Sequence, residues 1–265
     1  MDLCIDIGAT KTFVAVFDES ERQIHVSEQF LTESSKGFDH FLERLTTLCT
    51  RLLKGEKPRF WGICTAGAVD KDGVVLWSPN LGWKNLPLKE LMIPIFGEKG
   101  VIENDCNAAA YAEARVRDVE NLAYVTLSTG IGMGIVVNKK IYHGSHFSAG
   151  EIGHTIVDPD GPVCSCGRRG CLQAVASGRG LENQIFEITG QKVDCATILN
   201  YAQDGMEPYH TIVRRASLIL GKLLTNVVDI LDVDTIVLGG GLTKNEYYTN
   251  MVVEFIVKNY YRLPA

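Results

Sequence analysis

The chain has 265 residues, of which 46% are hydrophobic and 22% are charged, and these ordinary globular proportions exclude collagen-like and disordered classes. Its 26 basic and 32 acidic residues give a net charge of −6, which argues against general binding to nucleic acid or to anionic membranes. No apolar run reaches the roughly 18 residues of a membrane-spanning helix, and no basic segment leads a long apolar one at the N-terminus, so we expect a cytoplasmic protein. In that setting the eight cysteines are expected to be thiols or metal ligands rather than disulfides.

The first half of the chain predicts strands mixed with helices. Residues 3–7 and 12–17 predict two antiparallel strands joined by a tight glycine turn, and residues 23–30 predict a third strand. Further strands are expected at 60–65 and 101–105, and helices at 38–52, where apolar residues recur every three or four positions, and at 107–115.

The second half begins by repeating the first pattern. Residues 122–127 and 135–137 predict two strands around a glycine-rich turn at 128–134, and a later strand is expected at 235–238. An internal repeat of this length suggests two related domains, which we place at residues 1–106 and 107–265. Helices are expected at the following positions: 172–188, 195–203, 209–231 and 246–261.

Two glycine turns could bind phosphate. The first reads Asp6-Ile-Gly8-Ala-Thr10-Lys11-Thr12 and the second runs from Ser128 to Gly134. Glycine lets a phosphate approach the backbone, hydroxyls and Lys supply donors, and a nearby carboxylate can hold Mg²⁺. Each turn could equally be a plain hairpin turn.

Two further segments have both a functional and a structural interpretation. Gly239, Gly240 and Gly241 follow an apolar strand and either admit a flat or phosphate-bearing ligand or form a flexible turn. Asp105 follows the strand at 101–105 and is either a base for a phosphoryl acceptor or the N-cap of the next helix.

The strongest motif indicates a metal. Cys164, Cys166 and Cys171 lie within eight residues, interleaved with glycines, and His154 lies ten residues upstream. Three thiols and one imidazole form a structural zinc set with no open coordination position, so we expect structural Zn²⁺ rather than zinc-hydroxide catalysis.

Taken in order, these motifs resemble the ROK family of bacterial and archaeal sugar kinases, from residue 2 to about residue 243. The most specific element is Gly-Glu-Ile-Gly-His at 150–154 followed by Cys-Ser-Cys-Gly-Arg-Arg-Gly-Cys at 164–171. The resemblance implies an α/β protein with the actin-like ATPase, ribonuclease H-like fold, in which two α/β domains surround a cleft. It also implies a homodimer.

The family resemblance implies ATP, bound with Mg²⁺ between the two glycine turns, and a sugar whose hydroxyl, usually the 6-OH, gives its proton to Asp105. The implied nucleotide-binding residues are Asp6, Gly8, Ala9, Thr10, Lys11, Thr12, Thr129, Gly130, Gly132, Gly239 and Gly240. The implied sugar-binding residues, besides Asp105, are Gly67, Asn80, Asn104, Glu151, His154 and Gln173.

The main expectation is a glucokinase-like ATP:hexose phosphotransferase. One alternative is a kinase of N-acetylmannosamine or N-acetylglucosamine, and another is a non-catalytic sugar-binding or regulatory member. The chain departs from the family pattern at Gln173, where Glu is usual, and at Ala66, where Pro is usual. It also ends after the helix that follows Gly239, whereas family members usually continue into another strand and helix. No nucleic-acid or membrane partner is expected.

Overall fold

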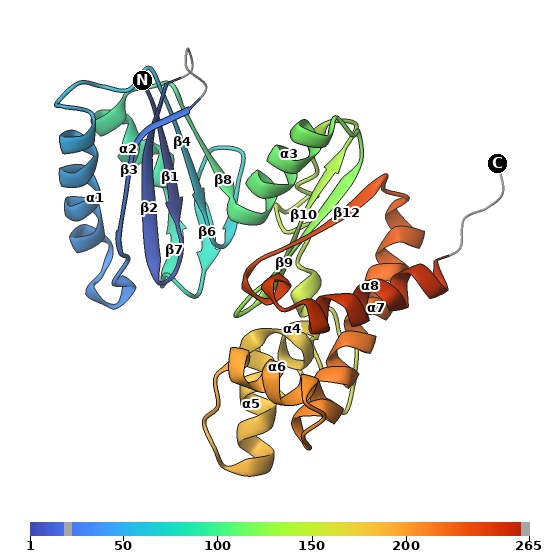
Figure 1. Cartoon of the computed structure of the whole chain (residues 1–265). Coiled ribbons are helices and arrows are strands. Elements are labelled where there is room, and N and C mark those ends of the chain that lie inside the picture. The colour runs from blue at the N-terminus through green and yellow to red at the C-terminus, as the bar shows by residue number, and fades with distance from the viewer. Residues whose placement is uncertain (19–22, 261–265) are drawn as a thin grey trace. The chain divides into compact units, whose positions relative to one another are not determined.

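A computed structural model describes residues 1–18 and 23–260. The chain divides into two compact units (Figure 1). Unit 1 comprises Met1–Ala108 with Gly144–Ser148, and unit 2 comprises Ala109–His143 with the chain from Ala149 onward.

Unit 1 is built on a five-stranded sheet in the order β3-β2-β1-β4-β8. Its strands are β1 (Asp2–Ile7), β2 (Lys11–Asp18), β3 (Gln23–Leu31), β4 (Phe60–Thr65) and β8 (Gly100–Asn104). Strand β2 pairs antiparallel with both β1 and β3, whereas β1, β4 and β8 run parallel to one another. Their carboxyl ends therefore share one edge of the sheet, which is where ligand-binding loops gather in sheets of this kind.

Strand β1 shows how the sheet divides its two faces. Leu3, Ile5 and Ile7 are buried, whereas the alternate residues Cys4 and Asp6 are exposed, as the two-residue period of a strand requires. The buried face packs with the apolar side of helix α1 (Phe38–Leu52), which lies alongside the sheet in Figure 1.

The rest of unit 1 was not predicted from the sequence. It holds helix α2 (Leu88–Phe96), which contains Pro94, and a small sheet of β5 (Ala68–Val69), β6 (Val75–Ser78) and β7 (Trp83–Leu86). These strands have two to four residues, too few to show an alternating pattern, and a proline within a helix obscures the helical signal.

Unit 2 repeats the arrangement around a four-stranded sheet in the order β11-β10-β9-β12. The strands are β9 (Leu122–Leu127), β10 (Ile131–Val137), β11 (Lys140–Ile141) and β12 (Thr235–Gly239). As in unit 1, the first strand of an antiparallel hairpin pairs on its other side with a parallel strand, here β12 beside β9. The internal repeat expected from the sequence is thus present in the sheet topology.

Helices cover both faces of this sheet. Helix α3 (Asp105–Arg117) packs through Ala110 and Ala114 on one face, and the larger core lies on the other. That core includes α4 (Leu172–Ala176), α5 (Gly178–Thr189), α6 (Cys195–Gln203), α7 (Tyr209–Leu231) and α8 (Glu246–Asn259). Three short 3₁₀ turns lie at Ser34–Lys36, Ile152–His154 and Gly241–Lys244.

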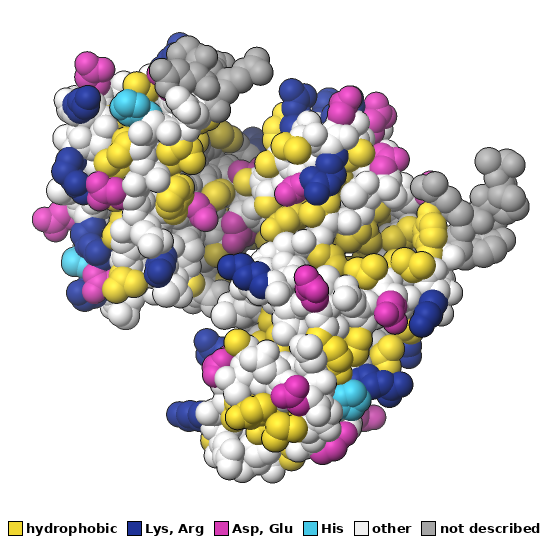
Figure 2. All heavy atoms as spheres, viewed as in Figure 1, with side chains coloured by type: hydrophobic (Ala, Val, Ile, Leu, Met, Phe, Trp, Pro, Cys, Tyr) yellow, Lys and Arg dark blue, Asp and Glu magenta, His cyan; other side chains and the backbone are white. Residues whose placement is uncertain are grey.

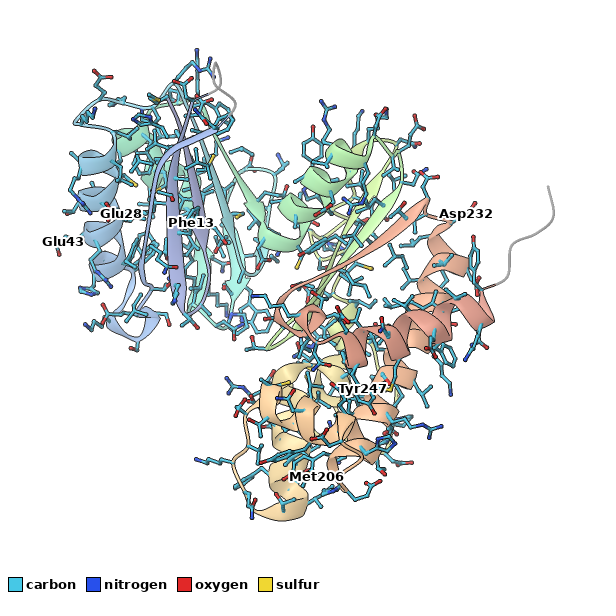
Figure 3. All side chains as sticks on the ribbon, in the orientation of Figure 1. Phe13, Glu28, Glu43, Met206, Asp232 and Tyr247 are labelled. Atoms are coloured by element: carbon cyan, nitrogen blue, oxygen red, sulfur yellow. The ribbon has the colours of Figure 1, made fainter. Side chains whose placement is uncertain are left out.

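Several predicted boundaries were wrong. The single helix expected at 172–188 is two helices, because Ser177 has an extended backbone and its side chain accepts the Gly180 amide as the N-cap of α5. The helix predicted at 209–231 is confirmed as α7, and its C-cap Asp232 has a left-handed conformation that turns the chain toward β12 (Figure 3). The expected end of the last helix, residue 261, lies outside the described residues.

Basic and acidic side chains are interspersed over the face shown in Figure 2. None of the helices within residues 1–18 and 23–260 has the length and hydropathy needed to cross a membrane.

Candidate functional site

The first glycine turn is held rigid by a residue that the sequence analysis missed. The Gly8 amide donates to the Lys11 carbonyl at 3.0 Å, which closes the turn between β1 and β2. The buried Thr32 hydroxyl donates to the Gly8 carbonyl at 2.7 Å and lies 3.0 Å from the Thr12 hydroxyl. Ala9, Thr10 and Lys11 stay exposed at the tip, so the turn presents a hydroxyl and an ammonium group on a fixed backbone. No sequence signal separates Thr32 from any other strand-end threonine.

Asp6 lies beside this turn in a partly dehydrated setting. It is paired with Cys64 across β1 and β4, and the Cys64 thiol donates to Asp6 Oδ1 at 3.5 Å. Loss of hydration raises the pKa of Asp6, the thiol lowers it, and the charge of Asp105 raises it. A carboxylate with these neighbours gains from a nearby cation, which fits the expected role in anchoring Mg²⁺.

Asp105 is the first residue of α3 and does not cap it. The residue that caps the helix is Asn104, whose side-chain oxygen accepts the Asn107 amide at 3.0 Å, while its Nδ2 donates to the Gly67 carbonyl at 2.9 Å. The N-cap interpretation of Asp105 was therefore wrong, and the strand expected at 101–105 is present but ends one residue earlier, at Asn104. The Asp105 carboxylate accepts the adjacent Cys106 amide at 2.8 Å and is half-buried.

Both the backbone conformation and the close neighbours of position 67 require glycine. Its φ is +112°, and a Cβ there would lie 2.5 Å from the Trp77 carbonyl oxygen, so the loop packs directly on β6. Asn80 lies exposed in the turn between β6 and β7. Unit 1 thus brings together Asp6, Gly67, Asn104 and Asp105 at the carboxyl ends of its parallel strands.

In unit 2 the second glycine turn is shorter than predicted. It comprises only residues 128–130, because Gly132 and Gly134 lie within β10, with Gly132 opposite Thr126 of β9. The turn is bound to the start of α5, since the Gly178 amide donates to the Ser128 carbonyl at 2.8 Å and the Arg179 amide donates to that of Thr129 at 3.3 Å. Thr129 is exposed, close to a helix N-terminus, where anions are favoured.

The glycines after β12 lie beside this turn. Because β12 runs parallel to β9 with Gly239 opposite Thr126, both strands end at the same edge. Gly240 has a φ of +93°, and a Cβ there would lie 2.4 Å from the Leu127 carbonyl oxygen. A Cβ on Gly239 would lie 2.1 Å from the Tyr124 hydroxyl. Only glycine fits at either position, and the two loops expected to contact the nucleotide in unit 2 are neighbours.

The four expected metal ligands converge. The ligand atoms of His154, Cys164, Cys166 and Cys171 all lie within 4.8 Å of one another. The Cys166 and Cys171 sulfurs are 3.7 Å apart, and His154 Nδ1 is 3.8 Å from Cys164 Sγ. Two sulfurs each about 2.3 Å from a tetrahedral Zn²⁺ would lie about 3.8 Å apart, so the donor set and its spacing fit zinc.

Local contacts prepare the thiols for a cation. Hydrogen bonds from the backbone, and then from the side chain, of Arg168 lower the pKa of Cys166 to about 6, which favours the thiolate that a metal binds. Burial raises the pKa of Cys171 to about 12, which favours its protonated form in the absence of a cation.

Two expected sugar-contacting residues adjoin the cluster. Glu151 Oε2 lies 3.9 Å from His154 Nε2, on the side of the ring away from Cys164, and Glu151 is exposed. This separation is longer than a hydrogen bond, so the carboxylate lies near the ring without fixing its orientation. Gln173, in the first turn of α4, directs its amide nitrogen to Cys164 Sγ at 3.3 Å and to Ser165 Oγ at 3.4 Å.

Comparison with known proteins agrees with this architecture. The ROK family model matches residues 2–264. An N-acetylmannosamine kinase of Vibrio vulnificus is 32% identical over 262 residues, which cover 97% of this chain and 88% of the relative. A similar enzyme of Salmonella typhi is 33% identical over 261 residues, with the same coverage.

Solved structures of related proteins share the fold. A ROK hexokinase from Thermus thermophilus superimposes with a TM-score of 0.85 at 30% identity, covering 99% of this chain and 90% of its own. A ROK family glucokinase from Streptomyces griseus, in complex with glucose and AMPPNP, gives a TM-score of 0.80 at 27% identity, covering 100% and 92%. With this sequence match, this sheet topology and these neighbours, the chain belongs to the ROK family and has its actin-like ATPase fold.

Proposed function

We propose that this chain is an ATP-dependent kinase that phosphorylates the 6-hydroxyl of an N-acetylhexosamine, with N-acetylmannosamine as its sugar. The observation that carries the choice of sugar is the identity of 32–33% to N-acetylmannosamine kinases along 97% of the chain. This proposal replaces the glucokinase-like activity that was the main expectation from the sequence.

The arrangement of unit 1 supports the phosphotransfer step. The Asp105 carboxylate accepts the proton of the sugar hydroxyl as its oxygen attacks the γ-phosphorus of ATP. Asn104 fixes the start of α3 and the Gly67 loop by its two hydrogen bonds, which keeps the base in position. Mg²⁺ bound with ATP supplies charge neutralisation, and Asp6 is the carboxylate that anchors it, directly or through water.

The glycine turns account for nucleotide binding. Thr10 and Lys11 in unit 1, and Thr129 in unit 2, donate to phosphate oxygens. Gly239 and Gly240 leave room for the adenosine. Catalysis of this kind depends mainly on positioning and on charge stabilisation, which suits turns held by Thr32 and by the start of α5.

The sugar is bound by Asn80, Asn104, Glu151 and His154. In this proposal His154 has two roles, since Nδ1 faces the cysteine cluster and the Nε2 side faces Glu151. When bound at the cluster, Zn²⁺ fixes the loop that carries Glu151 and His154. It takes no part in the phosphate chemistry, because its four protein ligands leave no open position.

The experiment that tests the proposal measures ADP release from Mg·ATP with N-acetylmannosamine, N-acetylglucosamine, glucose, mannose, fructose and allose. We expect N-acetylmannosamine to give the highest kcat/KM and its 6-deoxy analogue to give no turnover. Preference for glucose would contradict the proposed sugar and would favour glucokinase activity, which is the activity named for the Streptomyces griseus relative. If no sugar stimulates ADP release by folded, zinc-loaded protein while a sugar still binds, a non-catalytic role replaces the kinase.

A further inference from the structure

Gln173 contacts three segments of unit 2 at once. Its amide nitrogen donates to Cys164 Sγ at 3.3 Å. A Cβ added to Gly130 or to Gly153 would lie 3.6 Å or 3.3 Å from its amide oxygen. One half-buried side chain thus lies among the cysteine cluster, the turn at 128–130 and the Ile152–His154 turn.

The orientation of the amide matches the chemistry of a metal-bound sulfur. A thiolate ligand carries no hydrogen and can only accept, so the amide must present its nitrogen to Cys164 and its oxygen to the other side. Three thiolates, one neutral imidazole and one Zn²⁺ carry a net charge of −1. A neutral N–H donor stabilises such a centre.

The two glycines make this contact close. Neither Gly130 nor Gly153 has a side chain, and a Cβ on Gly153 would also lie 2.1 Å from the Ile131 carbonyl oxygen. The backbone of the 128–130 turn, the Ile152–His154 turn and the Gln173 amide therefore pack without intervening side chains. A shift of Cys164 would move Gln173 and would open this packing.

We propose that Gln173 is a positioning residue that stabilises the zinc-bound Cys164 thiolate and transmits metal occupancy to the turn at 128–130. The hydrogen bond to sulfur lowers the rate at which the metal leaves. The amide oxygen, packed at Gly130 and Gly153, holds the loop of Glu151 and His154 in place beside the turn at 128–130. The second part rests on the proposed function of that turn in nucleotide binding.

The first test measures zinc release to an excess of a chromogenic chelator in the absence of sugar and ATP. Gln173→Leu removes the donor. Gln203→Leu is the matched control, because Gln203 is exposed at the end of α6 and takes the same substitution. We expect release about tenfold faster in Gln173→Leu and no change in the control.

A second measurement separates this role from general destabilisation. In Co²⁺-substituted protein, loss of the hydrogen bond to sulfur moves the thiolate-to-metal charge-transfer band to longer wavelength in Gln173→Leu, and the band of Gln203→Leu stays in place. An unchanged release rate and an unshifted band in Gln173→Leu would overturn the proposal. Since neither assay contains substrate, the result is independent of whether the chain phosphorylates a sugar.

If Gln173 transmits metal occupancy, the zinc-loaded Gln173→Leu protein shows a raised KM for ATP. A normal KM for ATP, together with faster zinc release, would restrict the role of Gln173 to the metal centre and overturn the coupling to the turn.

Discussion

The sequence offered Asp105 both as a base and as the N-cap of α3, and the structure assigns the cap to another residue. Asn104 caps the helix, so Asp105 is not needed for the cap and keeps its proposed role as the base. We expect Asp105→Asn to lower kcat by about 10²–10⁴-fold, the usual contribution of a positioned base, while binding of the sugar persists. The stability of the Asp105→Asn variant changes little, because the Asn104 cap remains and the new Asn oxygen can still accept a hydrogen bond from the Cys106 amide. The weaker interaction with the helix dipole costs about 0.3–1 kcal/mol.

The matched variant is Asn104→Ala. It removes the cap, worth about 1 kcal/mol, and also the bond to the Gly67 carbonyl. We expect its thermal midpoint to fall by about 2–4 °C or more, and the midpoint of Asp105→Asn to stay near that of the unmodified chain. The assays are ADP release with the preferred sugar and thermal unfolding followed by circular dichroism. Near-normal turnover by folded Asp105→Asn would refute the assignment of the base, and an unchanged midpoint in Asn104→Ala would refute the assignment of the cap.

Three further predictions follow from the loops. Thr32→Val leaves the Gly8 carbonyl without its donor and should lower the free energy of unfolding by about 1–3 kcal/mol, measured by urea denaturation. Gly240→Ala forces a side chain into a left-handed backbone beside a carbonyl and should weaken ATP binding in calorimetry. Gly241→Ala, whose Cβ would meet nothing closer than 3.9 Å, should bind ATP normally, and equal affinities would contradict the argument. We expect elemental analysis to give one zinc ion per chain for the unmodified protein and none for Cys171→Ser, and retention of a full complement would rule out Cys171 as a ligand.

Long elements with a regular pattern could be predicted from the sequence. Strand β1 alternates buried and exposed residues, and α1 and α7 keep one apolar face. Here the local pattern and the tertiary burial agree, so periodicity was enough. The small sheet of β5, β6 and β7 could not be predicted, because its strands gain stability from packing on neighbouring loops rather than from their own pattern.

The candidate site was predictable where its residues lie close together in sequence. The cysteine cluster needed only the spacing between His154 and Cys171, and its four ligand atoms do converge. The partners of these residues were not predictable. Thr32 reaches Gly8 across 24 positions, and Gln173 meets Gly130 from another element, so each contact depends on the tertiary fold. The glycines of β10 were misread as a turn because glycine in a strand and glycine in a turn look alike in sequence.

The pairing of β9 with β12 has a consequence for the order of folding. The ligands of the cysteine cluster are neighbours along the chain, so that loop can close and take up its metal while the chain is still being made. The glycines beside the 128–130 turn belong to β12, which enters the sheet only after α4–α7 have been synthesised. Closing so long a loop is slow. A nascent chain would therefore acquire zinc before it could bind nucleotide, and the metal loop would be in place when the last strand arrives.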